Sequence, residues 1–410
     1  MDIGRPATNR VSSQAEPPSP PDLLSTQSPV SEHAIENAAE HAIEGAAEHA
    51  IEGAAPKTTN PLPQEELTPP QESAPVAREH ALVAAAPRGG MPAALTEPPS
   101  LLALWWKLLR PGRLWLSLWS IILGAAIAWF GSSGSSGGVF HPIRLVVFAL
   151  AVLAIHAGAN LLNEYYDVQR GADVEAAPGT SGVLQKGLLS EEMVQRAGLV
   201  SLAAGALVLL IVVLVAHAWS ALILGAAAVL LAYLYSATPY ALGYWWLGEV
   251  VIGFVMGPAI VISSVQIQGA QVGSLAITFS LALGAFAAAV TLAKNLRDME
   301  LDRAANKRTL ATLLGPQMGR TLYLALVLLP YLFVVVVAFP HGRPHGVLLV
   351  LLTAAELVVV MSGILRAEAP AATNVVAAQT MRLHWRFSLC LLVGYLLSIA
   401  VVALTGFLGI

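Results

Sequence analysis

Two acidic motifs stand where long apolar stretches of this chain end: Asn160-Leu-Leu-Asn163-Glu-Tyr-Tyr-Asp167-Val-Gln-Arg170-Gly-Ala-Asp173 and Asn295-Leu-Arg297-Asp298-Met-Glu-Leu-Asp302. An unpaired carboxylate beside a membrane costs several kcal/mol, so such acids need a cation nearby. Basic residues alternate with them, and Arg303, Lys307 and Arg308 directly follow the second motif. Acids of this kind hold divalent metals, and bases of this kind hold polyanions. The pattern therefore indicates a membrane enzyme that handles a diphosphate.

The composition is that of a polytopic membrane protein. Of the 410 residues, 56% are hydrophobic and 12% are charged, whereas about 25% of the residues in a soluble domain are charged. The single cysteine, Cys390, excludes a disulfide within one chain. No basic stripe is interleaved with aromatic residues, so nucleic-acid binding is not expected.

The first 100 residues have a different composition from the rest. They are rich in Pro, Ala, Glu, Ser and Thr, and an octapeptide is repeated three times over residues 32–55. Such a segment cannot bury enough apolar surface to fold alone, so we expect a disordered tail at 1–100. Its regularly spaced histidines fit that tail better than a metal site. The tail lacks the apolar core of a signal peptide, so the first spanning helix is expected to direct insertion.

From Leu101 onward, the chain repeatedly forms apolar windows long enough to cross a bilayer. About 20 residues of helix span about 30 Å of hydrocarbon. We expect about nine spanning helices, at roughly 113–130, 143–164, 196–217, 219–236, 247–267, 274–294, 320–339, 346–365 and 387–408.

Basic residues mark one side of these spans. The loops on that side carry 15 Lys and Arg residues, and the loops on the other side carry 2. The positive-inside rule then places the N-terminal tail and the basic side in the cytoplasm of a multi-pass cell-membrane protein. Even-numbered spans end on that side, so both acidic motifs are expected to meet at one face. The fourth span ends there too, and the segment Tyr235–Tyr240 after it is expected to form a third wall of the site.

The spacing within each motif favours a Mg²⁺ site. Asn163 and Asp167 are four residues apart, as are Asp298 and Asp302, which places each pair on one face of a helix. Oxygen ligands suit Mg²⁺, which keeps waters and shares its coordination shell with substrate phosphates. A single pair of this kind is more often a solvated helix end, whereas two pairs on one face favour a metal.

Both motifs resemble the signatures of the UbiA superfamily of membrane prenyltransferases, over 160–173 and 295–311. Their extensions, together with the stretch from Tyr235 to Pro258, are most similar to the 1,4-dihydroxy-2-naphthoate polyprenyltransferase branch of menaquinone synthesis. The similarity covers about 105–410. It implies an all-α fold of nine spanning helices around a central cavity that the two motifs cap, so that 101–410 is the prenyltransferase domain.

The resemblance also implies roles for individual residues. The metal-associated residues are Asn163, Asp167, Asp173, Asp298 and Asp302, and all of these except Asp173 are also the catalytic candidates. Substrate contacts are implied for Arg297, Lys307, Arg308, Arg170, Lys294, Lys186, Tyr235 and Asn295. The chain departs from the branch at Glu164, where Asp is usual and a direct role in metal binding is questioned, and at Asn306, where Gly is usual.

The expected reaction is Mg²⁺-dependent transfer of a prenyl group from a polyprenyl diphosphate to an aromatic acceptor, with 1,4-dihydroxy-2-naphthoate favoured. Polar partners for that acceptor are expected among Tyr235, Tyr240, Tyr244 and Glu249. The alternative acceptors within the superfamily are 4-hydroxybenzoate, homogentisate, a tetrapyrrole and a glyceryl phosphate. An ion-coupled transporter is the alternative from another class, but it requires charges near the helix midplanes, whereas the acids here lie at helix ends.

Overall fold

The computed structural model describes residues 99–131, 140–172, 180–339 and 344–408. Within these ranges the chain is helical and contains no strand. The described helices belong to one compact unit, Ala94–Ile410. The octapeptide repeat and the expected disordered tail, up to residue 98, lie outside the described residues.

The helices follow one another along the chain as α3 (Leu101–Leu109), α4 (Pro111–Gly131), α5 (Pro142–Gln169), α6 (Glu191–Ala216), α7 (Trp219–Leu234), η1 (Leu242–Tyr244), α8 (Gly248–Phe254), η2 (Val255–Ala259), α9 (Ile260–Ile267), α10 (Ser274–Arg297), α11 (Met299–Ala304), α12 (Leu310–Ala338), η3 (His345–Thr353), α13 (Ala354–Arg366) and α14 (Pro370–Leu408).

The expectation of about nine spanning helices is confirmed. In the described part of the chain, eight helical stretches are long and apolar enough to cross a membrane, and α7, with 16 residues, is the shorter ninth. One stretch joins α8, η2 and α9, and another joins η3 and α13. Helix α14 begins at Pro370, well before the expected window near 387. Helix α12 is interrupted at Gly315, where the backbone is not helical, so its long apolar part begins near the expected residue 320. Hydropathy marks the part of a helix inside hydrocarbon, and α14 continues beyond it.

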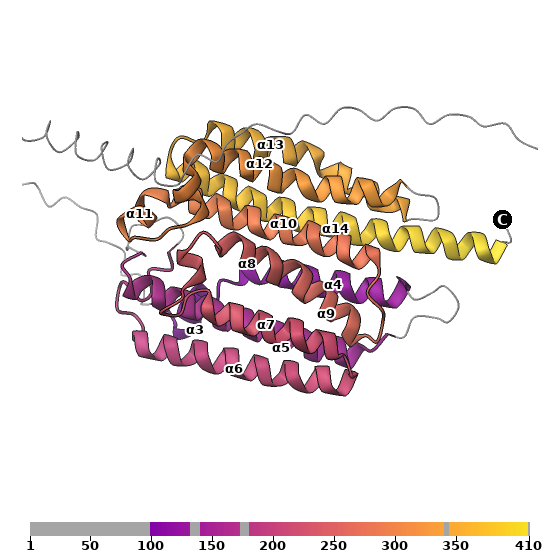
Figure 1. The fold of residues 1–410 in the computed structure, drawn as a ribbon, viewed down its shortest axis with the longest axis horizontal. Helices are drawn as coiled ribbons and strands as arrows, with labels where there is room; N and C mark the ends of the chain where they lie inside the picture. Colours follow the sequence, from indigo (N-terminus) through magenta and orange to yellow (C-terminus); the bar gives the residue numbers. More distant parts are fainter. Residues whose placement is uncertain (1–98, 132–139, 173–179, 340–343, 409–410) are drawn as a thin grey trace, which may run out of the picture. The chain divides into compact units, whose positions relative to one another are not determined.

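The spanning helices form two groups (Figure 1). One group contains α10, α12, α13 and α14, the other contains α5, α6 and α7, and α4, α8 and α9 lie between them. In the first group the ring of Phe286 on α10 packs edge to face against those of Tyr331 and Phe387. Such pairs are worth about 0.5–1.5 kcal/mol each beyond the area they bury.

Glycines bring α10 into backbone contact with the middle layer. A Cβ on Gly257 would lie 2.3 Å from the backbone oxygen of Ser280, and a Cβ on Gly284 would lie 2.4 Å from the backbone oxygen of Gly253. Neither position accepts a larger residue unless the helices move apart, as at other small-residue contacts between membrane helices. Pro258 lies in the π-helical turn η2, a typical place for a break in the hydrogen-bond ladder.

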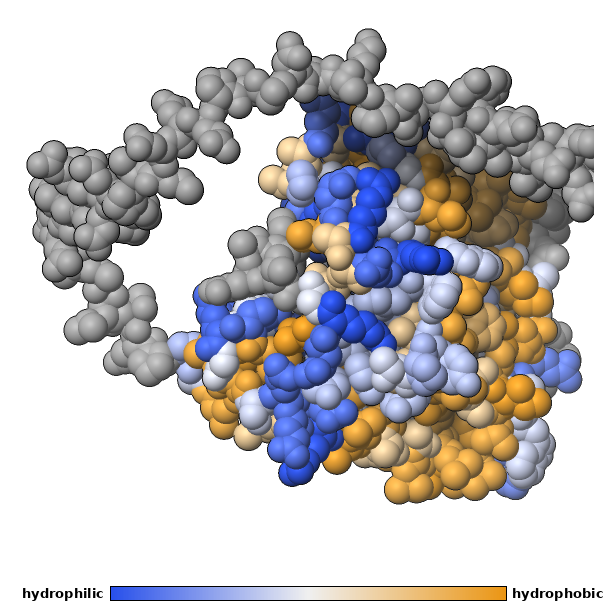
Figure 2. Space-filling model, turned by 60° about the vertical axis from the view of Figure 1, so that its left-hand side comes forward, coloured by the Kyte–Doolittle hydropathy of each residue, from blue (hydrophilic) through white to orange (hydrophobic). Residues whose placement is uncertain are grey.

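Polar residues collect at one end of the helices. Figure 2 shows hydrophilic residues gathered at the end that carries α3 and α11 in Figure 1, and hydrophobic residues along the adjoining flank. The chain after α7 contacts both acidic motifs at this end, because Tyr244 donates to Asp167 of the first and Glu249 accepts from Asn295 of the second. The expectation that the three segments share one face is confirmed.

Candidate active site

Asp167 lies on the last turns of α5 and points toward η1. It is buried, and its Oδ1 accepts a hydrogen bond of 2.8 Å from the Tyr244 hydroxyl. Burial, with the Asp167 carboxylate nearby, raises the pKa of Tyr244 well above its usual range. Tyr244 therefore stays protonated and donates to Asp167, which leaves the second carboxylate oxygen for another ligand.

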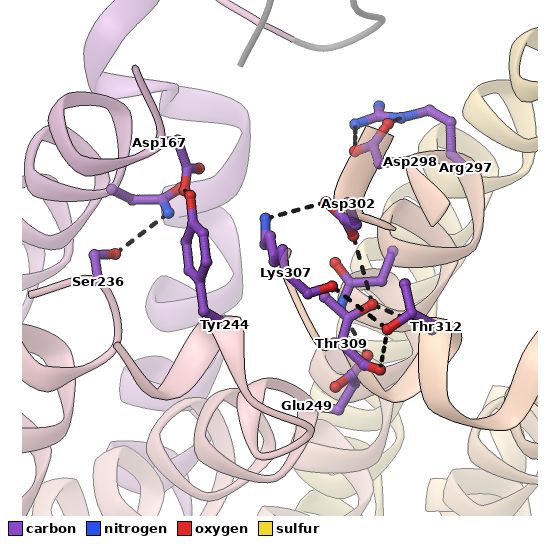
Figure 3. A network of polar contacts seen from close by, with 12 residues as sticks. Asp167, Ser236, Tyr244, Glu249, Arg297, Asp298, Asp302, Lys307, Thr309 and Thr312 are labelled. Atoms are coloured by element: carbon purple, nitrogen blue, oxygen red, sulfur yellow. Dashed lines mark hydrogen bonds and ion pairs between the residues drawn. The ribbon is translucent and has the colours of Figure 1, made fainter. Parts of the chain in front are cut away.

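Lys307 lies between the two acidic motifs (Figure 3). Its Nζ is 3.5 Å from Asp302 Oδ1 and 5.0 Å from the centroid of the Tyr244 ring. Burial lowers the pKa of Lys307, but the charges of Asp167 and Asp302 outweigh it and raise the pKa above the usual range. A protonated ammonium group thus neutralises carboxylates from both motifs.

The second motif is not one regular helix, contrary to the expectation that Asp298 and Asp302 share a helix face. Helix α10 ends at Arg297, Asp298 is the junction, and α11 begins at Met299. The backbone N–H of Asp302 still bonds to the Asp298 carbonyl at 2.8 Å, so the one-turn spacing survives the break. At the break, the Arg297 guanidinium binds both carboxylate oxygens of Asp298 at 2.6 and 2.5 Å and also donates to Asn374 on α14.

Asp302 is the more enclosed acid of the second motif. Its side chain is 3% exposed, against 24% for Asp298. Burial raises the pKa of Asp302 to about 6, although Lys307 opposes the shift. Of the two aspartates of this motif, Asp302 is therefore the one whose ionised carboxylate is stabilised most by a nearby cation.

Arg170 and Asn163 join the first motif to the segment after α7. The Arg170 guanidinium stacks over the Tyr244 ring at 4.3 Å, and its Nη1 donates to the Ser236 backbone oxygen at 2.8 Å. Asn163 Nδ2 donates to Ser236 Oγ at 3.3 Å. Through Ser236, the expected third segment, Tyr235–Tyr240, therefore contacts the first acidic motif.

A cavity opens beside these residues and extends into the apolar interior. Its volume is about 160 Å³, while one ordered water needs about 10–15 Å³, so it is larger than a packing defect. Four of the expected site residues line it, at its polar end: Asn163, Tyr235, Lys294 and Asn295. Farther in, the walls are apolar side chains of α4, α5, α7, η2 and α9. Burial raises the pKa of Tyr235 to about 12, so its hydroxyl is a proton donor facing the cavity.

The other expected residues do not line this cavity. The residues that make the contacts described above, outside the cavity wall, are Asp167, Asp302, Lys307, Arg170, Arg297 and Asp298. Arg308 is exposed, with its guanidinium 5.9 Å from the Trp245 ring. Lys186 is exposed on the segment between α5 and α6. Asp173 lies outside the described residues.

Several residues at the cavity were not among the expected ones. Arg113, Ser117, His156 and Asn160 also line it, and Ser117 Oγ is 2.6 Å from His156 Nδ1. A signal for two of them was present in the sequence: His156, Asn160, Asn163 and Asp167 form a polar stripe at three- and four-residue spacing along an otherwise apolar helix.

Glu164, the position that departs from the family pattern, has a structural partner. Its carboxylate is fully buried, forms an ion pair with Arg110 before α4 and accepts from Ser181. Glu249 makes another buried contact, in which Oε1 accepts from Asn295 at 2.8 Å. In the described part of the chain, its Oε2 has no hydrogen-bond partner.

The oxygen ligands at this end fit Mg²⁺ shared with a substrate. Among the described residues, no three His, Cys, Asp or Glu side chains are close enough to hold a metal alone. Mg²⁺ at phosphate sites, however, commonly takes one or two carboxylates and completes its shell with waters and phosphate oxygens. Asp167 and Asp302 face the same ammonium group from opposite motifs, which supplies that number of carboxylates.

Comparisons with known proteins identify the family of the chain. Residues 117–383 match the model of the UbiA prenyltransferase family. The chain is 27% identical over 296 residues to a 1,4-dihydroxy-2-naphthoate octaprenyltransferase of Bacillus subtilis (strain 168), covering 72% of this chain and 92% of that protein. It is 33% identical over 239 residues to the UbiA prenyltransferase domain-containing protein 1 of Mus musculus, covering 56% and 67%.

Solved structures share the fold. A digeranylgeranylglyceryl phosphate synthase superposes with a TM-score of 0.51 at 16% identity, covering 72% of this chain and 98% of that one. A UbiA homologue from Archaeoglobus fulgidus bound to GPP and Mg²⁺ also has a TM-score of 0.51 at 16% identity, covering 69% and 99%.

The Arg110–Glu164 pair predicts a stability defect. Glu164→Gln should lower the free energy of unfolding in detergent by about 3 kcal/mol, because it removes the charge of a fully buried carboxylate that forms an ion pair with the Arg110 guanidinium. The matched control is Glu300→Gln, which breaks an exposed ion pair with Arg303 and should change stability by less than about 1 kcal/mol. Equal unfolding temperatures for the two variants would contradict the assignment.

Proposed function

The chain belongs to the UbiA prenyltransferase family, and we propose that it transfers a prenyl group from a polyprenyl diphosphate to 1,4-dihydroxy-2-naphthoate with Mg²⁺. The observation that carries the proposal is the pairing of Asp167 and Asp302 across Lys307, beside the polar end of an otherwise apolar cavity. One end of the site thus suits a metal-bound diphosphate, and the interior suits an isoprenoid chain.

Asp167 and Asp302 are the proposed metal ligands, with Asn163, Asp173 and Asp298 around them. When bound, Mg²⁺ neutralises charge on the leaving diphosphate and so favours cleavage of the allylic C–O bond. Lys307 is paired with Asp302, and Arg170 stacks on the Tyr244 ring beside Asp167, so both are proposed to hold phosphate oxygens. Lys294 lines the polar end of the cavity and is proposed as a further substrate contact. Arg297, Arg308 and Lys186 are proposed as outer contacts.

The cavity keeps bulk water from the allylic cation. Its inner walls are apolar residues such as Val152, Ile155 and Val255, so an attacking nucleophile must be brought in by binding. Tyr235 and Asn295 present polar groups at the polar end. They are proposed to orient the acceptor, with Tyr244 and Glu249 behind them.

The choice of acceptor is supported by the name of the Bacillus subtilis relative, which is aligned over almost its full length. The alternative acceptors, in place of 1,4-dihydroxy-2-naphthoate, are 4-hydroxybenzoate, homogentisate, a tetrapyrrole and a glyceryl phosphate. We also propose that the site faces the cytoplasm from a cell membrane, since 15 loop Lys and Arg residues lie on its side and 2 on the other.

A transfer assay tests the function directly. Purified protein in detergent receives geranylgeranyl diphosphate with either 1,4-dihydroxy-2-naphthoate or 4-hydroxybenzoate, in Mg²⁺ or in EDTA, and products are identified by mass. We expect a prenylated and decarboxylated naphthoate product in the presence of Mg²⁺ and no product in EDTA. Product from 4-hydroxybenzoate only would show that 4-hydroxybenzoate, and not the naphthoate, is the acceptor. An undiminished yield in EDTA would refute the dependence on a divalent metal.

The metal assignment predicts loss of transfer without loss of fold. Asp167→Ala and Asp298→Ala should each lower kcat by at least about 100-fold, because each removes charge that holds the diphosphate through the metal. Each variant should remain folded and elute at the volume of the unchanged protein, although loss of the Tyr244 hydrogen bond or of the Arg297 ion pair should lower its unfolding temperature. Glu300→Ala serves as an exposed acidic control. A folded variant of Asp167 with near-normal turnover would refute its role.

The catalytic unit is proposed to be 101–410, since the tail contributes no motif to the site. A chain that begins at Ala94 should therefore keep Mg²⁺-dependent transfer in membranes. Its kcat/KM is compared with that of the full chain at equal protein level. Loss of activity in a well-expressed truncated chain would show that the tail takes part.

A further inference from the structure

The polar end of the reaction cavity carries two positive charges that have no acidic partner. Arg113 lies on the first turn of α4 and Lys294 on the last turn of α10, and both line the cavity. Both are partly buried. In the described part of the chain, neither of these two cavity cations forms a hydrogen bond or an ion pair. A charge withdrawn from water is costly unless it is paired, so the two cavity cations indicate a site for an anion.

The cations that lie three residues nearer the helix ends are already paired. Arg110 forms an ion pair with Glu164, and Arg297 forms one with Asp298. Both oxygens of each carboxylate are engaged, since Glu164 also accepts from Ser181 and Asp298 binds Arg297 through both of its oxygens. These acids therefore serve the outer cations, and the cavity cations remain for a ligand.

The two cavity cations lie close to each other. Helices α4 and α10 pack together, the charge of Arg113 acts on Lys294, and both charges act on His156, which lines the same cavity. The His156 ring is held by Ser117, whose Oγ is 2.6 Å from Nδ1. Two neighbouring charges of like sign are stabilised when an anion binds to both. The expected ligand is therefore one anionic group shared by Arg113 and Lys294.

The walls of the cavity indicate which anion fits. Among the described residues that line it, none is Asp or Glu, so a diphosphate here would have no carboxylate with which to share a metal. Asp167, Asp302 and Lys307, which are proposed to hold the metal and the diphosphate, do not line the cavity. Most of the remaining lining residues are apolar. A flat aromatic ring with a carboxylate matches this lining, because its charge meets the polar end and its ring meets apolar side chains.

We propose that Arg113 and Lys294 bind the carboxylate of the aromatic acceptor, and that this pair makes the enzyme selective for acceptors that carry one. The inference rests on the proposed function and assigns two residues to the choice of acceptor. The arginine offers paired donors that match the two oxygens of a carboxylate, and the lysine adds a second charge. A carboxylate held in this way keeps the ring at the polar end, where Tyr235 and Asn295 also line the cavity.

A pair of acceptors that differ in the carboxylate tests the proposal. Arg113→Gln and Lys294→Gln should each lower the ratio of kcat/KM for 1,4-dihydroxy-2-naphthoate to kcat/KM for 1,4-dihydroxynaphthalene by at least about tenfold, because a charge-assisted hydrogen bond is lost. A general disturbance of the fold would lower both values and leave the ratio unchanged. Arg113→Lys keeps the charge and should retain most of the ratio. Arg196→Gln is the matched control, since Arg196 is 73% exposed and pairs with Glu192.

Binding to the unchanged protein tests the same proposal without a variant. Calorimetry compares 1-hydroxy-2-naphthoate with its methyl ester, which lacks the negative charge. We expect the acid to bind at least about tenfold more tightly than the ester, and we expect Arg113→Gln to remove most of that difference. Equal affinities of acid and ester for the unchanged protein would overturn the proposal.

The diphosphate is the other anion of the reaction, and its binding is measured in parallel. If Arg113→Gln and Lys294→Gln weaken the binding of geranyl diphosphate with Mg²⁺ but leave the affinity for 1-hydroxy-2-naphthoate unchanged, the cavity cations belong to the diphosphate site and the proposal is wrong. Absence of prenyl transfer to either acceptor would instead refute the proposed function. The comparison of acid and ester would then still decide whether the cavity binds an aromatic carboxylate.

Discussion

The structure depends on the neutralisation of carboxylates at the edge of a membrane. Asp167 and Asp302 are both buried, and an isolated ionised carboxylate in such surroundings is too costly to persist. Lys307, at 3.5 Å from Asp302 and facing the Tyr244 ring, supplies the positive charge between them. The Tyr244 hydroxyl supplies a hydrogen bond to Asp167. Residues from three distant parts of the chain are therefore required to meet at one point.

The helices are packed so that this meeting is possible. The backbone contact of Gly257 with Ser280 and of Gly284 with Gly253 leaves no freedom in the position of α10 against the middle layer. Helix α10 carries Lys294 and Asn295 at the cavity mouth and leads into Asp298 and Asp302. A shift along this contact would move the second motif relative to the first. The small residues inside the bilayer thus determine the geometry at its edge.

The sequence predicted the parts of this arrangement that follow from periodicity and charge. Apolar windows gave the number of crossings, and alternation of basic loops gave the face on which the motifs meet. The break at Asp298 was not predicted, and it coincides with a contact of Arg297 to Asn374 on α14, 77 positions away, that no local spacing can reveal. The ion pair of Glu164 with Arg110 was not predicted for the same reason, since the two residues are 54 positions apart in the sequence. Spacing describes one helix at a time, whereas such pairs are set by tertiary packing.

The same charges explain why a metal and a diphosphate suit this site best together. Before any ligand binds, Lys307 already occupies the space between the two acids. A divalent cation alone would meet that ammonium group, and a diphosphate alone would meet Asp167 and Asp302, so each ligand by itself faces a like charge. In the proposed complex of metal and diphosphate, Asp167 and Asp302 would hold the metal, and Lys307 and Arg170 would hold the phosphate oxygens. The site thereby favours the donor in the metal-bound form from which the diphosphate leaves most easily.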